Sequence, residues 1–214
     1  HWIGKHIGED DFAALVDVTS AYSVLSVMGP KSAELLGRLS PDDLSKEGLL
    51  FSTTREIDVG YARVRAARIS YIGGPGYELY VTTDQCVTLY DALHEAGARV
   101  GLRDAGYYTI DALRIEAGRR AWGAELGPDE TPLEAGLAYA VRMDKASTFI
   151  GHDALVRQQA QGLKKRLLQF IFDDPAAFPW GGEPIWMDGQ SVGELTSAGY
   201  SRRHGRAVAM GYAR

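Results

Sequence analysis

The sequence has a single cysteine, no long hydrophobic run and no excess of basic charge. Cys86 alone cannot form an internal disulfide or supply a cysteine-rich zinc site, which favours a reducing compartment. No apolar run approaches the roughly 20 residues that a membrane-spanning helix needs. The 28 acidic residues outnumber the 23 basic ones and give a formal charge of −5, which disfavours a general nucleic-acid binder. We therefore expect a soluble globular protein with no membrane and no nucleic-acid partner.

The motifs of several common catalytic and cofactor sites are also missing. Gly-x-Ser-x-Gly is absent, and none of the 5 histidines lies in a known nucleophile or metal-binding pattern. The Gly-rich segment 73–76 lies inside a predicted hairpin and is not followed by Gly-Lys-Ser/Thr. It is therefore neither a phosphate-binding loop nor a dinucleotide fingerprint. We expect no catalytic triad, no nucleotide-binding loop and no metal site.

The spacing of apolar residues predicts a chain of mixed helices and strands, long enough for one large domain with a small appendage. The polar and basic segment 158–166 is a candidate linker, and short strand-like runs follow it. Asp188-Gly189 between two of these runs indicates a hairpin. The expected helices are 30–39, 82–97 (with Thr82 and Gln85 at capping-box spacing), 104–117 and 152–160, and the expected strands are 22–28, 61–71, 77–82, 167–172, 184–187, 191–197 and 207–213.

Three polar residues are candidates for binding a ligand: Tyr71, Glu78 and Arg114. A carboxylate accepts paired hydrogen bonds from a planar heterocycle, a tyrosine offers a flat apolar face, and a guanidinium suits a carboxylate. The alternative is structural. In that case Glu78 is exposed on the polar face of its strand, and Arg114 pairs with Asp111 on the same helix. Residue types alone leave both interpretations open.

Several motifs, taken in order, resemble those of the tetrahydrofolate-binding aminomethyltransferases, the family of the glycine cleavage system T-protein. This family includes the C-terminal half of flavin-dependent dimethylglycine and sarcosine dehydrogenases and oxidases. The motifs are LSVMGPKS at 25–32, SYIGGPGYELY at 70–80, DALRIEAG at 111–118 followed by Trp122-Gly123 and Glu125-Leu126, TPLEAGL at 131–137 followed by Lys145 and Phe149-Ile150-Gly151, and the tail segments 182–185 and 192–198. Together they cover nearly all of the chain from about residue 15 and look closer to the dehydrogenase branch.

The resemblance implies an α+β fold, with a T-protein-like folate-binding domain at 1–158 and a small C-terminal β-barrel domain at 166–214. It implies that Tyr71, Glu78 and Arg114 are cofactor-binding residues, with Glu78 accepting hydrogen bonds from the pterin of tetrahydrofolate. The expected activity transfers a one-carbon unit from an iminium, derived from an N-methyl amine, to tetrahydrofolate, which gives 5,10-methylenetetrahydrofolate. The alternatives are a T-protein aminomethyltransferase and a non-catalytic folate-binding protein with a regulatory or RNA-modification accessory role.

The sequence departs from the family pattern at two places. Gly74 stands where the family usually carries an acid. The family's catalytic aspartate lies upstream of the Gly-Pro-Lys motif, and nothing before residue 20 matches its setting. We therefore expect this chain to be the downstream part of a longer polypeptide, with FAD bound only in an upstream domain. The expected partners are folate and a small methylated amine, and the expected compartment is the cytoplasm, or the mitochondrial matrix in a eukaryote.

Overall fold

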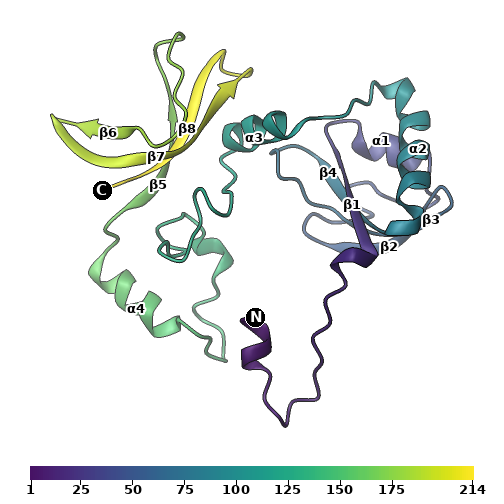
Figure 1. Ribbon diagram of the computed structural model, residues 1–214, viewed down its shortest axis with the longest axis horizontal. Coiled ribbons are helices and arrows are strands. Elements are labelled where there is room, and N and C mark those ends of the chain that lie inside the picture. The colour runs from purple at the N-terminus through teal and green to yellow at the C-terminus, as the bar shows by residue number, and fades with distance from the viewer. The chain divides into compact units, whose positions relative to one another are not determined.

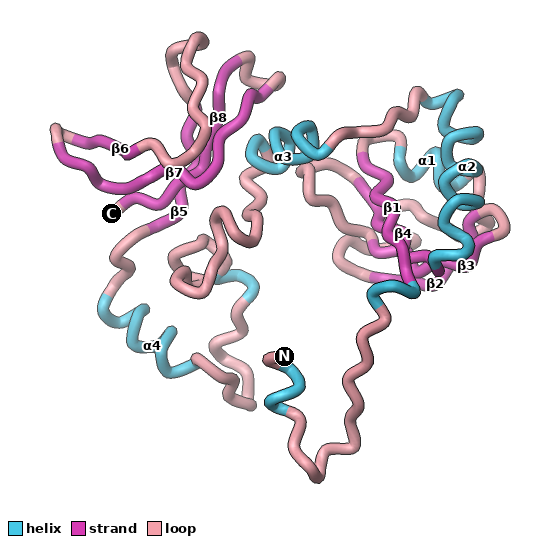
Figure 2. The backbone as a smooth tube through the Cα atoms, viewed as in Figure 1, coloured by secondary structure: helices cyan, strands magenta, loops and turns pink.

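The computed structural model describes all residues from 1 to 214, which form two compact units (Figure 1). The first unit contains residues 1–70 and 74–103, and the second contains residues 71–73 and 104–214. Each unit has its own sheet of four antiparallel strands. Figure 2 draws these strands in magenta. The mixture of helices and antiparallel sheets confirms the predicted α+β class.

The first unit is built on a sheet with the strand order β1-β4-β3-β2. Its strands are β1 (Tyr22–Met28), β2 (Thr54–Val59), β3 (Ala62–Ala67) and β4 (Gly76–Thr82), and its helices are α1 (Ser32–Gly37) and α2 (Cys86–Gly97). Short 3-10 turns occupy Ile3–His6, Thr19–Ala21, Thr83–Gln85 and Ala98–Val100. The β1 and α1 positions agree with the predicted strand at 22–28 and the helix that follows Gly29-Pro30.

The core of the first unit lies on one face of this sheet. Tyr77, Leu79 and Val81 alternate along β4 and are buried there, because side chains in a strand point to opposite faces in turn. The helices α1 and α2 supply buried leucines to the same cluster, among them Leu36 and Leu89. The intervening β4 residues therefore point to the opposite face, which places Glu78 outside this core.

Three local predictions for the first unit were wrong in detail. The strand predicted at 61–71 ends at Ala67. Arg68 still exchanges backbone hydrogen bonds with Ser52 and Thr53, and the chain then turns at Ile69, whose N–H bonds to the carbonyl of Ala67 at 3.1 Å. Strand β2 was not predicted, since Ile57 and Val59 are the only apolar residues among its 6. The capping box is absent: Thr82 makes no side-chain capping bond, and α2 begins only at Cys86, after a 3-10 turn.

The second unit joins helices to a C-terminal sheet with the strand order β5-β8-β7-β6. Its elements are α3 (Tyr107–Glu116), the 3-10 turn Ala138–Ala140, α4 (His152–Gln161), β5 (Arg166–Ile171), β6 (Pro184–Met187), β7 (Gln190–Ser201) and β8 (Arg206–Ala213). Helix α3 packs against β7 and β8, with Ile115 buried beside Val208 and Met210. Gly199 allows this approach, because a Cβ there would lie 3.4 Å from the Cα of Ala112.

The tail of the chain follows the sequence prediction closely. Asp188 and Gly189 have φ values of 53° and 76° and connect Met187 to Gln190, as expected for a two-residue hairpin turn. Gly118, predicted to end the helix at 104–117, has a φ of 64° just after α3. The candidate linker is short, since α4 ends at Gln161 and β5 begins at Arg166. None of the helices combines the length and the apolar composition of a membrane-spanning segment.

Candidate functional site

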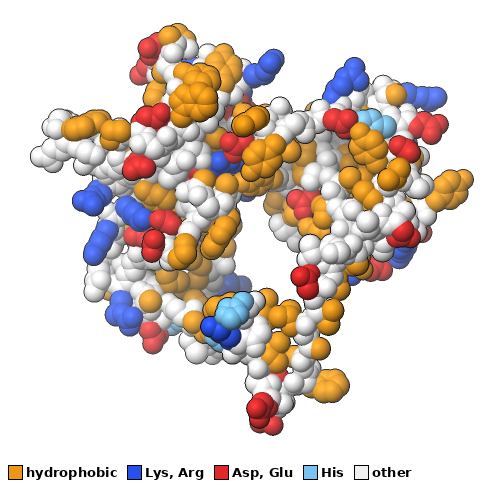
Figure 3. Space-filling view, in the orientation of Figure 1, with side chains coloured by type: hydrophobic (Ala, Val, Ile, Leu, Met, Phe, Trp, Pro, Cys, Tyr) orange, Lys and Arg blue, Asp and Glu red, His pale blue; other side chains and the backbone are white.

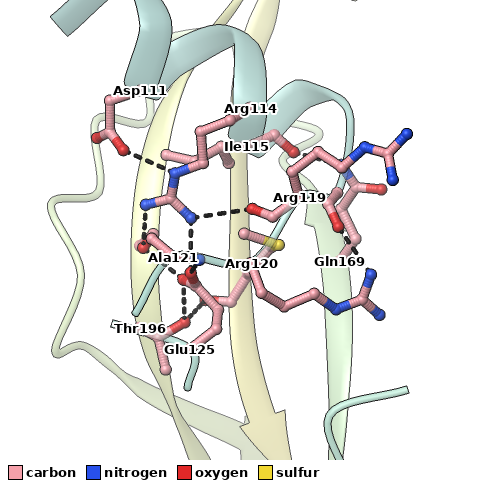
Figure 4. A network of polar contacts seen from close by, with 12 residues as sticks. Asp111, Arg114, Ile115, Arg119, Arg120, Ala121, Glu125, Gln169 and Thr196 are labelled. Atoms are coloured by element: carbon pink, nitrogen blue, oxygen red, sulfur yellow. Dashed lines mark hydrogen bonds and ion pairs between the residues drawn. The ribbon is translucent and has the colours of Figure 1, made fainter. Parts of the chain in front are cut away.

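Arg114 lies at the centre of a buried polar network in the second unit (Figure 4). Its side chain is only 4% exposed. Nε donates to Oδ1 of Asp111 at 2.7 Å, and Nη1 donates to Oε2 of Glu125 at 2.6 Å. Nη2 donates to Oγ of Ser197 in β7 at 2.8 Å, so one guanidinium ties helix α3 to the C-terminal sheet. The predicted pairing with Asp111 is confirmed.

Glu125 is the anion at the base of this network, and its side chain is fully buried. Oε2 also accepts the backbone N–H of Ala121 at 2.9 Å, and Oε1 accepts the hydroxyl of Thr196 at 2.7 Å. The hydroxyl of Ser197 also donates to Oε1. Every carboxylate oxygen therefore has charged or polar donors, which is the condition for burying a charge without a large penalty.

A bulge in β7 explains how two successive residues reach the same carboxylate. The pairing of β7 with β8 shifts between Leu195 and Ser197. In a regular strand Thr196 and Ser197 would point to opposite faces of the sheet. The extra residue of a bulge bends the strand and redirects side chains, so both hydroxyls face Glu125. Glu125 and this pair of hydroxyls were missed by sequence reasoning, because they lie far apart along the chain.

The electrostatics of the network favour a permanently charged arginine. Burial by itself would lower the pKa of Arg114, but the hydrogen bond that Arg114 donates to Asp111 and the negative charge of Glu125 outweigh it and leave the pKa raised. Beside it, Tyr212 donates to the backbone carbonyl of Glu125 at 2.8 Å. Burial, followed by the nearby carboxylates of Glu130 and Glu134, raises the pKa of Tyr212 to about 12.

Tyr71 belongs to the second unit and lies near this network. Its hydroxyl donates to the backbone carbonyl of Arg120 at 3.0 Å, and the ring stays partly exposed. Burial is the main cause that raises the pKa of Tyr71, so the hydroxyl stays protonated at neutral pH. Because the hydroxyl proton is already donated, what Tyr71 can offer a ligand is chiefly its flat ring.

Glu78 belongs to the first unit, on the face of β4 opposite the core. It is half-buried and pairs in register with Ser26 of β1 and Ala67 of β3, so neighbouring side chains are small. Its Oε2 accepts the hydroxyl of Tyr80 at 2.7 Å, and this hydrogen bond is the main cause of the raised pKa of Tyr80. No hydrogen bond reaches Oε1, which therefore remains able to accept one from a ligand.

The structure thus brings Arg114 and Tyr71 into one unit and places Glu78 in the other. The contact of all three with a folate stays a prediction. The guanidinium of Arg114 is engaged within the chain on all three of its nitrogens, including a further bond from Nη1 to the carbonyl of Arg119 at 3.3 Å. Glu78 is half-buried and one of its two oxygens has no partner in the chain, so both the ligand-binding and the structural interpretation of this residue stay predictions.

Two protein-family models together match nearly the whole chain. The GCVT N-terminal domain matches residues 1–145, and the glycine cleavage T-protein C-terminal barrel domain matches residues 165–214. Human mitochondrial dimethylglycine dehydrogenase is 40% identical over 92% of this chain. The mitochondrial pyruvate dehydrogenase phosphatase regulatory subunit of Mus musculus is 36% identical over 99% of it. The chain spans only 23% and 25% of those two relatives, respectively.

A solved structure has the same fold. The glycine cleavage system aminomethyltransferase T from Bartonella henselae superposes with a TM-score of 0.77 at 26% sequence identity. The match covers 90% of this chain and 51% of that one. The fold predicted from the resemblance is therefore confirmed.

Proposed function

The chain belongs to the glycine cleavage T-protein family, and we propose that it is the folate-binding part of a protein like the sarcosine and dimethylglycine dehydrogenases. In this proposal an upstream flavin domain oxidises an N-methyl amine to an iminium. The present chain holds tetrahydrofolate. One folate nitrogen attacks the iminium carbon, and a second folate nitrogen then displaces the demethylated amine from that carbon, which gives 5,10-methylenetetrahydrofolate, the free amine and a proton. The proposed compartment is the cytoplasm, or the mitochondrial matrix in a eukaryote.

The single observation that carries the proposal is the state of the Glu78 carboxylate. Oε2 is fixed by Tyr80, while Oε1 has no partner in the chain. A pterin presents adjacent N–H groups, and a carboxylate with a free oxygen at a fixed position suits them. The residues that pair with Glu78 in register, Ser26 and Ala67, have small side chains. Tyr71, in the second unit, stays a predicted cofactor-binding residue.

Arg114 has a different part in this proposal. Its guanidinium is held by Asp111, Glu125 and Ser197, so a direct contact with folate would compete with existing hydrogen bonds. Holding a reacting group beside its partner is worth on the order of 7–11 kcal/mol in favourable cases, provided that the supporting residues are rigid. We propose that Arg114 first of all fixes α3 and the adjoining loop, and that any contact with the ligand is secondary.

The direct test is calorimetric titration of the full-length protein with 5-formyltetrahydrofolate, a stable folate analogue. Glu78→Ala is expected to weaken binding by more than about 1.5 kcal/mol, or over tenfold, the value of a hydrogen bond to a charged group. Glu56→Ala is the matched control, because Glu56 lies in the same sheet but pairs with Arg65 at 3.3 Å. An unchanged affinity in Glu78→Ala would reject the assignment and leave the fold untouched.

A second candidate function is non-catalytic folate binding in a regulatory protein. The observation in its favour is the match, over 99% of this chain and 25% of the relative, to the pyruvate dehydrogenase phosphatase regulatory subunit of Mus musculus. The two candidates differ in turnover. The first requires that dimethylglycine or sarcosine yields 5,10-methylenetetrahydrofolate when tetrahydrofolate is added to the full-length protein. The second requires folate binding with no such product.

A T-protein aminomethyltransferase, acting on an aminomethyl-lipoyl carrier, is the alternative within the same reaction class. It is supported by the match to the aminomethyltransferase of Caldanaerobacter subterraneus, at 37% identity over 86% of this chain. The discriminating measurement is the amine donor: release of ammonia from an aminomethylated lipoyl protein supports the transferase, and oxidation of a free methylated amine supports the dehydrogenase.

A further inference from the structure

A cavity of about 430 Å³ lies in the first unit, on the side of the sheet where α1 and α2 pack. It is bounded by the residues that follow α1, by the turn between β2 and β3, by α2 and by the 3-10 turn after α2. Figure 3 shows basic and acidic side chains together over the part of this unit where Figure 1 labels α2. Glu78 points to the opposite face of the sheet, so the cavity is separate from the Glu78 carboxylate.

The floor of this cavity is apolar and fixed in place. Leu39 and Ala96 line it and also pack against the core of the unit. The backbone N–H of Gly60 donates to the carbonyl of Leu39 at 2.7 Å, which holds the turn between β2 and β3 at the end of α1. Gly60 has a φ of 59°, and a Cβ there would lie 3.7 Å from the Cβ of Ala92. The space therefore exists because these positions carry very small residues, and it suits small apolar groups.

Two opposite charges at the wall of the cavity are unpaired. Glu95 lies near the end of α2, and Arg99 lies in the 3-10 turn Ala98–Val100. Neither side chain makes a hydrogen bond or an ion pair, although a spacing of four residues favours pairing within an α-helix. Because α2 ends at Gly97 and residues three apart eclipse in a 3-10 turn, that pairing geometry is lost. A carboxylate and a guanidinium therefore lie free beside the same cavity.

Arg38 and Tyr61 complete the polar wall. Arg38 donates from Nη2 to Glu34 at 2.7 Å, which leaves its Nε and Nη1 without an acceptor. Tyr61 is 99% exposed, its hydroxyl makes no hydrogen bond, and no ring or cation stacks on it. The face of an aromatic ring attracts cations and is used to recognise methylated ammonium groups. The wall thus offers donors for an anion and two kinds of partner for a cation.

These groups together specify a ligand that carries both charges. The guanidinium of Arg99, with that of Arg38, suits a carboxylate, whereas Glu95 and the Tyr61 ring suit a methylated ammonium. A simple anion would also face Glu95, and a simple cation would also face the two arginines. We propose that this cavity binds an N-methylated amino acid in its zwitterionic form. The proposal does not rest on the proposed function, because none of these residues belongs to the proposed folate site.

The test is saturation-transfer NMR of the full-length protein with betaine, which is N,N,N-trimethylglycine, observed at its methyl signal. Betaine has no nitrogen lone pair, so a flavin cannot oxidise it to an iminium and the probe is not consumed. We expect saturable binding that Glu95→Gln/Arg99→Gln weakens about tenfold, as the loss of two exposed charge contacts would give. Lys46→Gln/Glu47→Gln is the matched control and should leave binding unchanged, because it removes the same two charges from an exposed pair 3.8 Å apart.

Tyr61→Leu tests the recognition of the methyl groups. It should weaken betaine binding about threefold, the effect of an exposed cation–π contact, and leave the binding of glycine nearly unchanged. No saturable binding of betaine, or binding that survives in Glu95→Gln/Arg99→Gln, overturns the site. Equal losses for betaine and glycine in Tyr61→Leu refute the preference for methylated ligands. If acetate displaces betaine as well as glycine does, the cavity takes simple carboxylates and the zwitterion assignment is wrong.

Discussion

Removal of the buried charge of Glu125 tests whether the network around Arg114 holds the second unit together. Glu125→Gln keeps the size of the side chain and lets the amide oxygen face Arg114, while the amide nitrogen faces the hydroxyls of Thr196 and Ser197. The guanidinium, only 4% exposed, would then depend on Asp111 alone for a counter-charge. Breaking a buried pair on one side typically costs about 3–5 kcal/mol, and the remaining Asp111 contact favours the lower end.

The assay is thermal and urea unfolding followed by circular dichroism. A loss of about 3 kcal/mol corresponds to a fall in Tm of about 6–12 °C for a chain of this size. Asp111→Asn is the matched comparison, because Asp111 is 38% exposed and its pairing should be worth at most about 1 kcal/mol. Adding Arg114→Met to Glu125→Gln should recover part of the loss, since no unpaired buried cation remains. If Glu125→Gln costs no more than Asp111→Asn, the reasoning is wrong.

Further measurements address other parts of the chain. The pKa of Tyr212 is raised to about 12 from its ordinary value of 10.0. Its contribution to the free energy of unfolding is therefore complete below pH 10 and is lost between pH 10 and 12, by up to about 1.4 kcal/mol per pH unit. Tyr212→Phe should flatten the plot of unfolding free energy against pH in this range, and an unchanged slope would contradict the assignment. Gly189→Ala should cost about 1 kcal/mol from its positive φ alone, since nothing lies within 4 Å of an added Cβ. Gly193→Ala should lower the free energy of unfolding by roughly 1–3 kcal/mol more than Gly189→Ala does, because an added Cβ at Gly193 would overlap the carbonyl oxygen of Tyr212. Equal losses of stability in the two variants would refute this steric argument. Tyr80→Phe removes the hydroxyl that bonds to Oε2 of Glu78. The variant should weaken folate binding by about 1 kcal/mol in the calorimetric assay and leave Tm nearly unchanged. A fall in Tm with normal affinity would show that Tyr80 contributes to stability alone.

The local signals in the sequence were sufficient for most of the elements. Alternation along 77–82 placed Glu78 on the face opposite Tyr77, and the structure has it there. Asp188-Gly189 specified a turn, because few residues other than Gly, Asn and Asp adopt positive φ readily. The spacing of Asp111 and Arg114 predicted their contact, which a single helix determines.

Contacts between residues far apart in the chain were not predicted from the sequence. Glu125 and Ser197 are separated by 72 residues, and no periodicity links a loop residue to a bulge in a distant strand. Strand β2 escaped prediction because its apolar residues are few and its burial comes from pairing with β3. The predicted capping box at Thr82 was wrong because a 3-10 turn, Thr83–Gln85, lies between Thr82 and helix α2, and residue spacing alone does not predict such a turn.

The sequence by itself determined the α+β class, the motifs of the glycine cleavage T-protein family, most element positions and the hairpin turns. These depend on local chain conformation and on side-chain periodicity, which adjacent residues specify. Only the tertiary structure decided that Arg114 is enclosed by Asp111, Glu125 and Ser197, that Glu78 keeps one free oxygen, and that Tyr61 and Arg99 share a cavity. Such contacts join segments far apart in the chain, and their burial and charge exist only after the core has closed.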